Sequence, residues 1–469
     1  MNRDIQRVFK LQQEHAPELA RMGPSERIER LLRIDKYLKD ENRVTELCDA
    51  MQKDFRKHEV EVIATEIGVV QAQISHTRKK LRSWMRSQKV KTPLPMVGTR
   101  SYIRYEPKGV VLIMAPWNYP FNLSLVPLVY AIASGNAAII KPSEVSANTS
   151  AFIKKMINEL FDESEVAVFE GGPSVAQELL DQPFNHIFFT GSPQVGRIVM
   201  TAAAKHLASV TLELGGKSPA IVDKTANVRK AARGAAWSKL MNNGQTCITP
   251  DYLILHDSIS DSFIDEFNGA VQEFYDPDGK GIENSPDYCR IINDFHFQRL
   301  KSLYDDAIAK GARVRVGADF KESERFISPT LIDNVSDDMN IMQEEIFGPM
   351  LPVVTFSQRS EVRDIIRKRP KPLTLYISSH DRENVDYFMG ETSAGGTVIN
   401  DYMLGYSNPY LPFGGVNDSG IGKSIGVHAF KAFSNERSVI RRKWGTLSML
   451  YPPYTNRVKI LIQTLYRWM

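Results

Sequence analysis

A cysteine and a glutamate in two short stretches are the residues best suited to covalent chemistry. Cys247 ends the run Asn-Asn-Gly-Gln-Thr-Cys at 242–247, and Glu213 lies in Leu-Glu-Leu-Gly-Gly-Lys at 212–217. A thiolate attacks a carbonyl carbon well, and a carboxylate can take a proton from the water that releases the acyl group. Each stretch alone is a weak signal, but together they predict a nucleophile and its general base.

An asparagine in an aromatic turn is a third candidate for the same chemistry. Asn118 lies in the run Met-Ala-Pro-Trp-Asn-Tyr-Pro at 114–120, directly after a predicted buried strand. Its amide donor could face the oxyanion that forms when a nucleophile adds to a carbonyl group. The motif alone favours an ordinary turn, because asparagine is a common turn residue.

A glycine-containing turn could bind a phosphate. Residues 189–196, Phe-Thr-Gly-Ser-Pro-Gln-Val-Gly, lie between a predicted strand and a predicted helix at 197–205. Free backbone amides and the positive end of the helix dipole favour an anion there. The spacing is not G-x-G-x-x-G, so a plain strand-to-helix turn is an equally good interpretation.

Two other motifs contain groups that could hold a nucleotide. Lys141 and Glu144, in Lys-Pro-Ser-Glu, could bind ribose hydroxyls, and Glu144 could also repel a 2′-phosphate. The alternative is a helix start capped by Ser143. Residues 344–349, Glu-Glu-Ile-Phe-Gly-Pro, offer a carboxylate and a ring for a ribose and a nicotinamide, with helix-end chemistry as the alternative.

Length and composition indicate a globular protein of several domains. A chain of 469 residues is too long for one core, so we expect two or three domains. The net charge of +4 is too small to indicate a nucleic-acid partner. Cys48, Cys247 and Cys289 predict neither a disulfide framework nor a metal site, and they favour a reducing compartment, the cytoplasm.

The two ends of the chain carry no targeting signal by their composition. The N-terminus begins with charged residues, which argues against a signal peptide, and no apolar run approaches the ~20 residues of a spanning helix. Residues 459–469 are apolar on one side and cationic, so they could contact a membrane surface. A terminal helix docked on the body or on a partner subunit is the favoured interpretation.

The pattern of apolar residues predicts an α/β protein. Helical spacing fills residues 1 to about 90, and an isolated strand follows at 101–107. Continuous apolar runs then alternate with helix-like segments, as expected for a doubly wound sheet that binds ligands at the carboxyl ends of its strands. These strands are predicted at 110–114, 137–140, 166–169 and 186–189. A second alternating region extends from 220 to about 398, with strands predicted near 252–255, 314–316 and 352–355.

Seven motifs in one order resemble the aldehyde dehydrogenase superfamily, and several runs resemble its class 3 branch. The motifs are Pro-Trp-Asn-Tyr-Pro, Lys-Pro-Ser-Glu, Phe-Thr-Gly-Ser, Leu-Glu-Leu-Gly-Gly-Lys-Ser-Pro, Gly-Gln-Thr-Cys, Glu-Glu-Ile-Phe-Gly-Pro and Leu-Pro-Phe-Gly-Gly. The resemblance implies a Rossmann-like nucleotide domain (1–88 and 108–212) and an α/β catalytic domain (213–432). It also implies a small β bridging or oligomerisation element (89–107 and 433–445) and a C-terminal tail (446–469).

The resemblance also implies roles for individual residues. Cys247 would form a thiohemiacetal and a thioester, Glu213 would act as general base, and Asn118 would complete an oxyanion hole with the Cys247 amide. NAD or NADP would be held by Trp117, Lys141, Glu144, Gly191, Ser192, Gly196, Glu345 and Phe347. The substrate, a medium- or long-chain aliphatic or an aromatic aldehyde, would contact Tyr119, Asn122 and Phe413. A homodimer is implied as well.

The sequence departs from the class 3 pattern near its end. Residues 416–420 are Val-Asn-Asp-Ser-Gly where Val-Gly-Asn-Ser-Gly is usual, and 423–426 are Lys-Ser-Ile-Gly where an aromatic residue and a histidine often stand. These positions lie near the substrate entrance in the family, so substrate size stays open. Two rival hypotheses are a thiol hydrolase or acyl-transferring enzyme that uses Cys247 without redox chemistry, and a catalytically silent binding or structural protein. The presence of all three catalytic candidates argues against the second.

Overall fold

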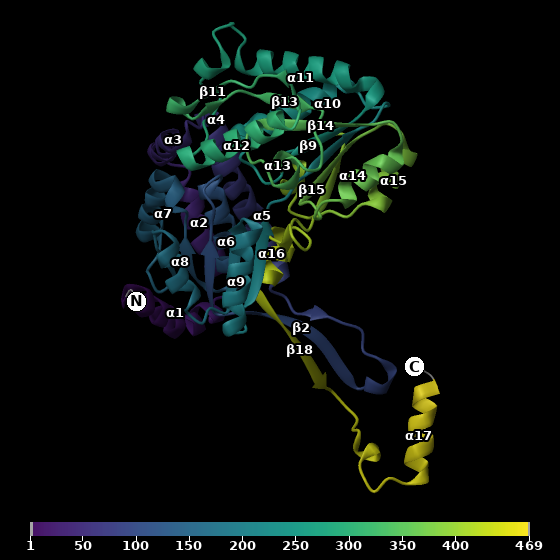
Figure 1. Cartoon of the computed structure of the whole chain (residues 1–469). Helices are drawn as coiled ribbons and strands as arrows, with labels where there is room; N and C mark the ends of the chain where they lie inside the picture. The colour runs from purple at the N-terminus through teal and green to yellow at the C-terminus, as the bar shows by residue number, and fades with distance from the viewer. Residues whose placement is uncertain (1–2, 468–469) are drawn as a thin grey trace.

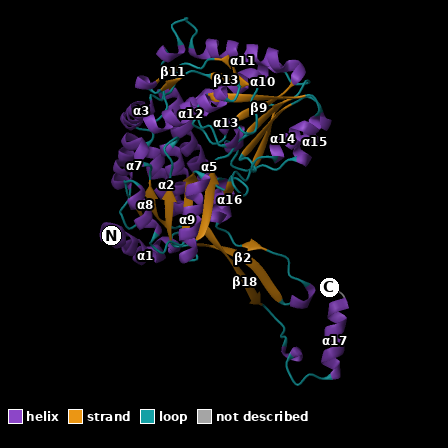
Figure 2. Ribbon diagram, viewed as in Figure 1, coloured by secondary structure: helices purple, strands orange, loops and turns teal. Residues whose placement is uncertain are grey.

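The chain folds into two lobes and a projecting arm. The computed structural model describes residues 3–467. One lobe contains the N-terminal half of the chain, the other contains most of residues 215–400, and the arm with strands β2 and β18 extends away from both (Figure 1). Each lobe has a sheet with helices on both of its faces (Figure 2).

The first lobe is built on a six-stranded sheet with the order β17-β7-β6-β3-β4-β5. Its strands from β3 to β7 run parallel to their neighbours, and β17 is antiparallel to β7. The strands are β3 (Val110–Met114), β4 (Ala137–Lys141), β5 (Val166–Val168), β6 (His186–Gly191), β7 (Ser209–Leu214) and β17 (Gly420–Ile421). The four strands that the apolar runs predicted are therefore present.

Alternation along these strands divides their side chains between two cores. Val111 and Ile113 pack with one set of helices, whereas Val110 and Leu112 pack with another. The first set is α2 (Pro24–Tyr37), α3 (Glu41–Phe55), α5 (Gly68–Trp84), α6 (Pro120–Ser134), α7 (Ala147–Leu160) and α16 (Gly426–Ala432). The second is α1 (Arg3–Arg21), α8 (Pro173–Leu180) and α9 (Pro193–Lys205). Burial of both faces explains why these strands are apolar throughout.

The second lobe has a seven-stranded sheet with the order β10-β13-β14-β9-β8-β15-β16. All its neighbouring strands are parallel except β10, which is antiparallel to β13. The strands are β8 (Pro219–Val222), β9 (Tyr252–His256), β10 (Arg313–Val316), β13 (Thr330–Asp333), β14 (Met350–Phe356), β15 (Thr374–Ser378) and β16 (Gly396–Ile399). The sequence analysis located β9, β10 and β14 but assigned no strand to β15 or β16.

Helices cover this second sheet in the same two-sided way. On one face lie α10 (Val228–Leu240) and α11 (Ser260–Tyr275). On the other lie α12 (Asp294–Ala309), α13 (Asn340–Gln343), α14 (Arg359–Arg367) and α15 (Arg382–Glu391). The remaining short elements are α4 (Glu59–Val62), β11 (Phe320–Lys321), β12 (Phe326–Ile327), the π-helical turn η1 (Ile63–Ile67) and the 3-10 turns η2 (Leu94–Met96), η3 (Glu144–Ser146), η4 (Met241–Gly244), η5 (Asp257–Ile259), η6 (Ile282–Asn284), η7 (Glu322–Glu324), η8 (Leu404–Tyr406) and η9 (Ser448–Leu450).

The arm is a three-stranded antiparallel sheet. Strands β1 (Gln88–Lys89) and β2 (Thr99–Pro107) pair with each other, and β2 pairs with β18 (Ser434–Arg442) from Pro107↔Ser434 to Thr99↔Arg442. The isolated strand of the sequence therefore joins a C-terminal strand, as the resemblance implied. Beyond β18, helix α17 (Asn456–Arg467) contains most of the cationic tail, whose last two residues lie outside the described residues.

The predicted domain ranges stay a prediction, and one segment of the catalytic range packs with the first lobe. Strand β17 and helix α16 lie within the range assigned to the catalytic domain, but β17 pairs with β7 and α16 packs in the core of the first lobe. Among the helices within residues 3–467, none has the length and apolar character needed to cross a bilayer.

Candidate functional site

A cavity of about 860 Å³ collects segments from both lobes. From the first lobe, it is lined by residues at the carboxyl ends of β3, β6 and β7. From the second, it is lined by loops that precede β8, β9, β14 and β15. Most of the predicted site residues line this cavity, namely Cys247, Glu213, Asn118, Gly191, Ser192, Glu345, Phe347, Trp117, Tyr119, Asn122 and Phe413.

The loop before Cys247 has an unusual backbone. Asn242, Asn243 and Gly244 have φ values of 50°, 56° and 72°, in the left-handed region that asparagine and glycine tolerate best. A side chain at Gly244 would also meet the Gly348 carbonyl oxygen at 2.2 Å. The Asn-Asn-Gly sequence thus allows a tight reversal from the end of α10, which directs the partly buried Cys247 to the cavity.

Asn118 and the cysteine loop are connected directly. The Asn118 side-chain amide donates to the Gln245 carbonyl at 2.9 Å, and the Asn242 side chain donates to the Asn118 carbonyl at 2.8 Å. An amide nitrogen has two hydrogens, so Asn118 keeps one donor for a ligand. The Gln245 side chain fixes the loop further by donating to the Arg290 carbonyl and accepting from Ile292 N–H.

Burial and nearby charges favour the protonated forms of Cys247 and Glu213 at neutral pH. Burial raises the pKa of Cys247 to about 12, and the charges of Glu345 and Glu213 add to that shift. Burial also raises the pKa of Glu213 to about 8, against the opposing effects of Ser424 and Lys423. Perturbed carboxyl and thiol groups around one cavity are typical of catalytic sites.

Glu213 occupies the end of β7, opposite Gly420 of β17. Its carboxylate oxygens are buried and have no hydrogen-bond partner among the described residues. One of them would lie 3.0 Å from a β-carbon at Gly414, so the glycine in Leu-Pro-Phe-Gly-Gly leaves space for this side chain. A buried carboxyl without a fixed partner is free to exchange a proton with a water or a ligand.

Some of the predicted cofactor residues line the cavity, and others lie outside it. The carboxyl ends of β3 and β4 meet, with Met114 opposite Lys141, and Lys141 Nζ lies 2.6 Å from Glu144 Oε2. Gly191 and Ser192 line the cavity at the start of α9, where Ser192 Oγ accepts from Val195 N–H. Lys141, Glu144 and Gly196 do not line the cavity.

Gly196 has a packing role in the structure. A β-carbon there would lie 2.8 Å from Leu214 Cδ2, so the glycine lets α9 approach the end of β7 closely. In the structure, Gly196 therefore places the N-terminus of α9 beside the end of β7. The nucleotide contact predicted for Gly196 stays a prediction.

One glycine gives Glu345 its place. A β-carbon at Gly215 would lie 2.0 Å from Glu345 Oε2, so the first glycine of the Gly-Gly pair after Glu213 leaves room for the second carboxylate. Burial raises the pKa of Glu345 to about 8, with Asp251 contributing in the same direction. Phe347, with a φ of 56°, packs edge-on against Trp117 at 5.4 Å between ring centroids.

Two cavity residues at the start of α12 are among those that the sequence did not predict. His296 lies 4.8 Å from the Trp117 ring, and burial lowers the pKa of His296 to about 4, so it is neutral at pH 7. Arg299 donates to the carbonyls of Glu345 and Ile346 and holds that loop. No motif marks the start of α12, and only tertiary packing brings it to this cavity.

The predicted substrate residues lie together on the other side of the cysteine. The Tyr119 hydroxyl is 2.9 Å from Thr246 Oγ1, and Asn122 donates to the Thr65 carbonyl at 3.1 Å. Phe413 packs edge-on against Tyr406 at 4.8 Å. Several apolar residues that the sequence analysis did not name complete this wall: Val69, Val126, Trp237, Met403 and Leu404.

The departures from the class 3 pattern have local explanations. Asn417 stands where a glycine is usual and has a φ of 56°, which asparagine tolerates. The neighbouring Asp418 forms an ion pair with Arg197 at 2.7 Å. Lys423 donates to the Gly414 carbonyl at 2.7 Å, beside Glu213.

Other thiols and acidic groups do not form a second centre of this kind. Cys48 packs against the first core, and Cys289 is buried with its thiol 3.8 Å from Glu61 Oε2. Within residues 3–467, no cluster of three or more His, Cys, Asp or Glu side chains could hold a metal ion.

Known proteins share this sequence and fold. The profile of the Aldehyde dehydrogenase family matches residues 1–439. A 4,4'-diaponeurosporen-aldehyde dehydrogenase of Staphylococcus aureus is 44% identical over 436 residues, 93% of each chain. Aldehyde dehydrogenase family 3 comG of Dictyostelium discoideum is 43% identical over 429 residues, 90% of this chain and 89% of the relative.

Solved structures agree with the sequence comparison. The substrate-bound structure of Staphylococcus aureus AldH superposes with a TM-score of 0.93 at 42% identity, covering 99% of this chain and 100% of that one. PnpE in complex with nicotinamide adenine dinucleotide has a TM-score of 0.84 at 27% identity, covering 95% and 91%. The match over nearly the whole chain shows that this protein belongs to the aldehyde dehydrogenase family.

Proposed function

We propose that the protein oxidises an apolar aldehyde, medium- or long-chain aliphatic or aromatic, to its carboxylic acid with NAD or NADP. The observation that carries the proposal is the convergence of Cys247, Glu213 and Asn118 on one cavity at the carboxyl edge of the first sheet. A nucleophile, a general base and an amide donor are the groups that aldehyde oxidation through a thioester needs.

The first half of the reaction uses the thiol. Burial raises the pKa of Cys247 to about 12, so the thiol must pass its proton to a base before it attacks. Ionised Glu213, a carboxylate in the same cavity, is that base. The sulfur then adds to the carbonyl carbon, and the free hydrogen of the Asn118 amide with the Cys247 backbone N–H receives the oxyanion. When the oxyanion collapses, a hydride leaves the carbon and a thioester remains on Cys247.

The second half releases the acid. Glu213 first releases the thiol proton to solvent. A water then attacks the thioester carbon and gives its proton to Glu213. The Cys247 sulfur leaves as a thiolate that regains this proton from Glu213, which gives the carboxylic acid. With a pKa of about 8, Glu213 is close to the pH at which a general base is most effective. This use of water favours hydrolysis over acyl transfer to a second organic substrate.

The residues of the first sheet edge fit a dinucleotide. Gly191 and Ser192 open α9, whose N-terminal amides suit a pyrophosphate, and Lys141 and Glu144 present polar groups to a ribose. Gly215 leaves room for Glu345, which with Phe347 and Trp117 would face the nicotinamide end. NAD or NADP, when bound there, supplies the hydride acceptor. Glu144 disfavours a 2′-phosphate by its charge, but its pairing with Lys141 reduces that effect.

The substrate wall supports an apolar aldehyde. Tyr119, Phe413 and Tyr406 present rings to the cavity, and aliphatic side chains continue the wall. The Staphylococcus aureus relative is named for 4,4'-diaponeurosporen-aldehyde, which agrees with an aldehyde substrate. The Asn122 amide adds a polar contact near the carbonyl end.

The exposed apolar residues of the arm suit a homodimer, and the cysteines suit the cytoplasm. Apolar side chains are exposed along it, among them Leu94, Ile440 and Trp444, and an oligomer would remove them from water. The three cysteines are unpaired, which agrees with a reducing compartment. We favour a protein partner over a lipid surface for α17, because the exposed aromatic residues Tyr451 and Tyr454 before it extend the apolar surface of the arm.

Reduced-nicotinamide absorbance tests the proposal. Benzaldehyde, hexanal and a long-chain aldehyde are each mixed with NAD or NADP and the protein, and absorbance should rise with at least one pair. Cys247→Ala should abolish that rise and keep nucleotide binding, whereas Cys48→Ala, a matched thiol outside the cavity, should leave it unchanged. Full oxidation by Cys247→Ala would contradict the nucleophile assignment, and ester cleavage without oxidation would favour a thiol hydrolase.

A further inference from the structure

A helix behind the cavity carries charged side chains that the proposed reaction does not use. It runs from α4 through η1 into α5, residues 59–84. Lys57, just before it, and Glu66 are buried with their charged groups 3.1 Å apart, and Glu61 is partly buried beside them. None of the three lines the cavity. Buried charges need partners, so their contacts indicate what they hold in place.

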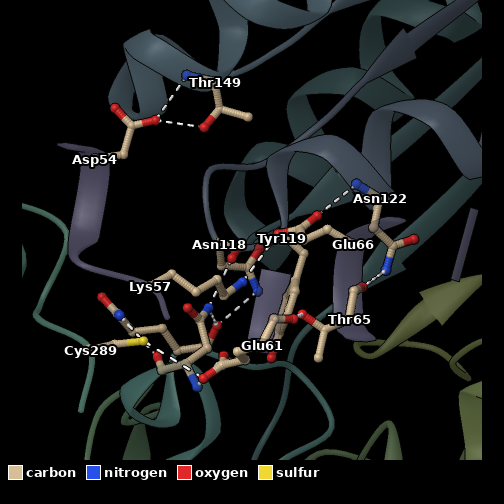
Figure 3. Close-up of polar contacts among 12 residues, drawn as sticks. Asp54, Lys57, Glu61, Thr65, Glu66, Asn118, Tyr119, Asn122, Thr149 and Cys289 are labelled. Atoms are coloured by element: carbon tan, nitrogen blue, oxygen red, sulfur yellow. Dashed lines mark hydrogen bonds and ion pairs between the residues drawn. The ribbon is translucent and has the colours of Figure 1, made fainter. Parts of the chain in front are cut away.

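One end of this cluster holds the segment that contains Asn118. Glu66 Oε2 accepts from the backbone N–H of Asn122 at 2.7 Å, and the Thr65 carbonyl accepts from the Asn122 side chain at 3.1 Å (Figure 3). The Lys57 ammonium lies 4.1 Å from the centroid of the Tyr119 ring, a cation–π contact. Tyr119 and Asn122, which follow Asn118, are therefore held in place by Lys57, Thr65 and Glu66.

The other end holds the segment that contains Cys247. Glu61 Oε1 accepts from the backbone N–H of Asn242 at 2.9 Å. The Asn242 side chain donates to the carbonyls of Asn118 and Gln245, at 2.8 and 3.2 Å. Glu61 therefore anchors the residue that joins the two segments to each other.

A π-helical turn lets one helix hold both segments. Side chains five residues apart point about 140° away from each other in a regular α-helix with 3.6 residues per turn. Glu61 and Glu66 have this spacing, and η1 begins between them and includes Glu66, with an i→i+5 bond from Gly68 N–H to the Ile63 carbonyl. The wider turn brings the two carboxylates toward the same side, and such turns are frequent at functional sites.

Gly68 is needed where the π turn closes. A β-carbon at Gly68 would lie 2.9 Å from the Ile63 carbonyl oxygen, closer than real β-carbons come to another atom. The φ of Gly68 is −61°, so its backbone would suit any residue, and the close approach to that carbonyl is what favours glycine.

We propose that Glu61 and Glu66, brought together by the π turn, are positioning residues that fix Asn118 relative to the backbone amide of Cys247. This rests on the proposed function, in which those two donors form the oxyanion hole. Two donors on segments far apart in sequence can serve one oxygen only if their separation is constant. A misplacement of about 1 Å at a reacting centre can lower the rate about 100-fold.

The cluster permits a clean substitution. It contains two carboxylates and one ammonium, so Glu61→Leu leaves Lys57 and Glu66 as a matched pair and removes the acceptors for Asn242 N–H and for the Cys289 thiol. We expect turnover to fall about 10- to 100-fold, with the Michaelis constant for the aldehyde and the dissociation constant for NAD changing less than about threefold. Glu61→Gln keeps an acceptor oxygen and should restore turnover to within about threefold.

A double-mutant cycle with Asn118→Ala separates positioning from general support of the fold. Once the Asn118 amide is gone, Glu61→Leu should cost less than about threefold, because interacting residues give non-additive effects. Hydrogen exchange over residues 240–247 should also accelerate in Glu61→Leu but not in Glu61→Gln. Equal rate losses in both backgrounds, or unchanged exchange, would overturn the positioning role. Absence of aldehyde oxidation in the wild type would instead refute the proposed function, and the exchange result would still decide the positioning role.

A glycine pair tests the π turn itself. Gly68→Ala should lower turnover about 3- to 10-fold and accelerate exchange over 240–247, as a smaller misplacement than the loss of Glu61. Gly269→Ala is the matched control, since Gly269 lies within α11 and a β-carbon there meets no atom within 4 Å. If Gly68→Ala behaved like Gly269→Ala, in rate and in exchange, the π turn would have no part in positioning.

Discussion

The two sheets have the same layered architecture but turn opposite edges to the cavity. The first sheet presents the carboxyl ends of β3, β6 and β7, whereas the second presents the loops that enter the amino ends of β8, β9, β14 and β15. At the first edge helix α9 begins, with its free amides and positive dipole end. At the second edge helix α10 ends and the strained loop to Cys247 follows.

The difference assigns different chemistry to the two edges. A carboxyl edge with a helix N-terminus suits an anionic ligand, so the first edge fits the nucleotide. The loops of the second edge bring Cys247 and Glu345 close together, with Glu213 at the end of β7 across from them. Glu213 and Asn118 belong to the first edge but act at the cysteine, whereas Lys141 lies outside the cavity. Substitutions beside Cys247 should therefore affect the chemistry, and substitutions at Lys141 should affect nucleotide binding.

Glu213 gives the largest expected effect among these tests. Glu213→Gln keeps the shape of the side chain but cannot accept a proton, so turnover should fall about 100- to 10,000-fold. NAD affinity, measured by titration, should stay within about twofold. A Glu213→Gln variant that kept its turnover and lost NAD binding would assign Glu213 to the nucleotide and not to the chemistry.

Asn118 should follow in magnitude. Loss of one oxyanion donor in Asn118→Ala should lower turnover about 100- to 1,000-fold, with the Michaelis constant for NAD unchanged. Steady-state kinetics measures the turnover with saturating NAD and the Michaelis constant with varied NAD. An unchanged turnover would place the oxyanion elsewhere, because the amide of Asn118 would then donate only to Gln245.

The pH dependence should show the base. Burial raises the pKa of Glu213 to about 8, and only its ionised form accepts a proton, so turnover should rise with pH and level off above about 8. Below that pH the slope should approach about tenfold per unit, as expected for one group. A profile already level at pH 6 would mean that another group acts as the base.

Lys141 should give a smaller effect confined to the nucleotide. Lys141→Met removes a charged hydrogen-bond donor, which corresponds to an increase of about tenfold in the Michaelis constant for NAD, with little change in turnover. Lys155→Met is a control, because Lys155 lies on the exposed side of α7 in an ion pair with Glu46. A loss of turnover at saturating NAD would show that Lys141 also takes part in the chemistry.

The sequence alone determined the fold class and identified the candidate reacting groups. Apolar runs such as 110–114 and 137–140 predicted buried parallel strands, because a strand covered on both faces needs apolar residues at every position. The aldehyde dehydrogenase resemblance rested on seven local motifs, and the comparisons confirmed it. Strands β15 and β16 were not predicted, because an apolar run of four or five residues does not by itself distinguish a strand from a buried helical segment.

Only the tertiary structure decided how these groups are placed and charged. The bond from Asn118 to Gln245 spans 127 positions, and no local pattern predicts it. The raised pKa values of Glu213 and Cys247 come from burial, which depends on both lobes at once. His296, Arg299 and the π turn at 63–67 were likewise invisible, because their importance lies in what they contact. Local patterns report periodicity and residue type, whereas distance and desolvation arise when remote segments pack together.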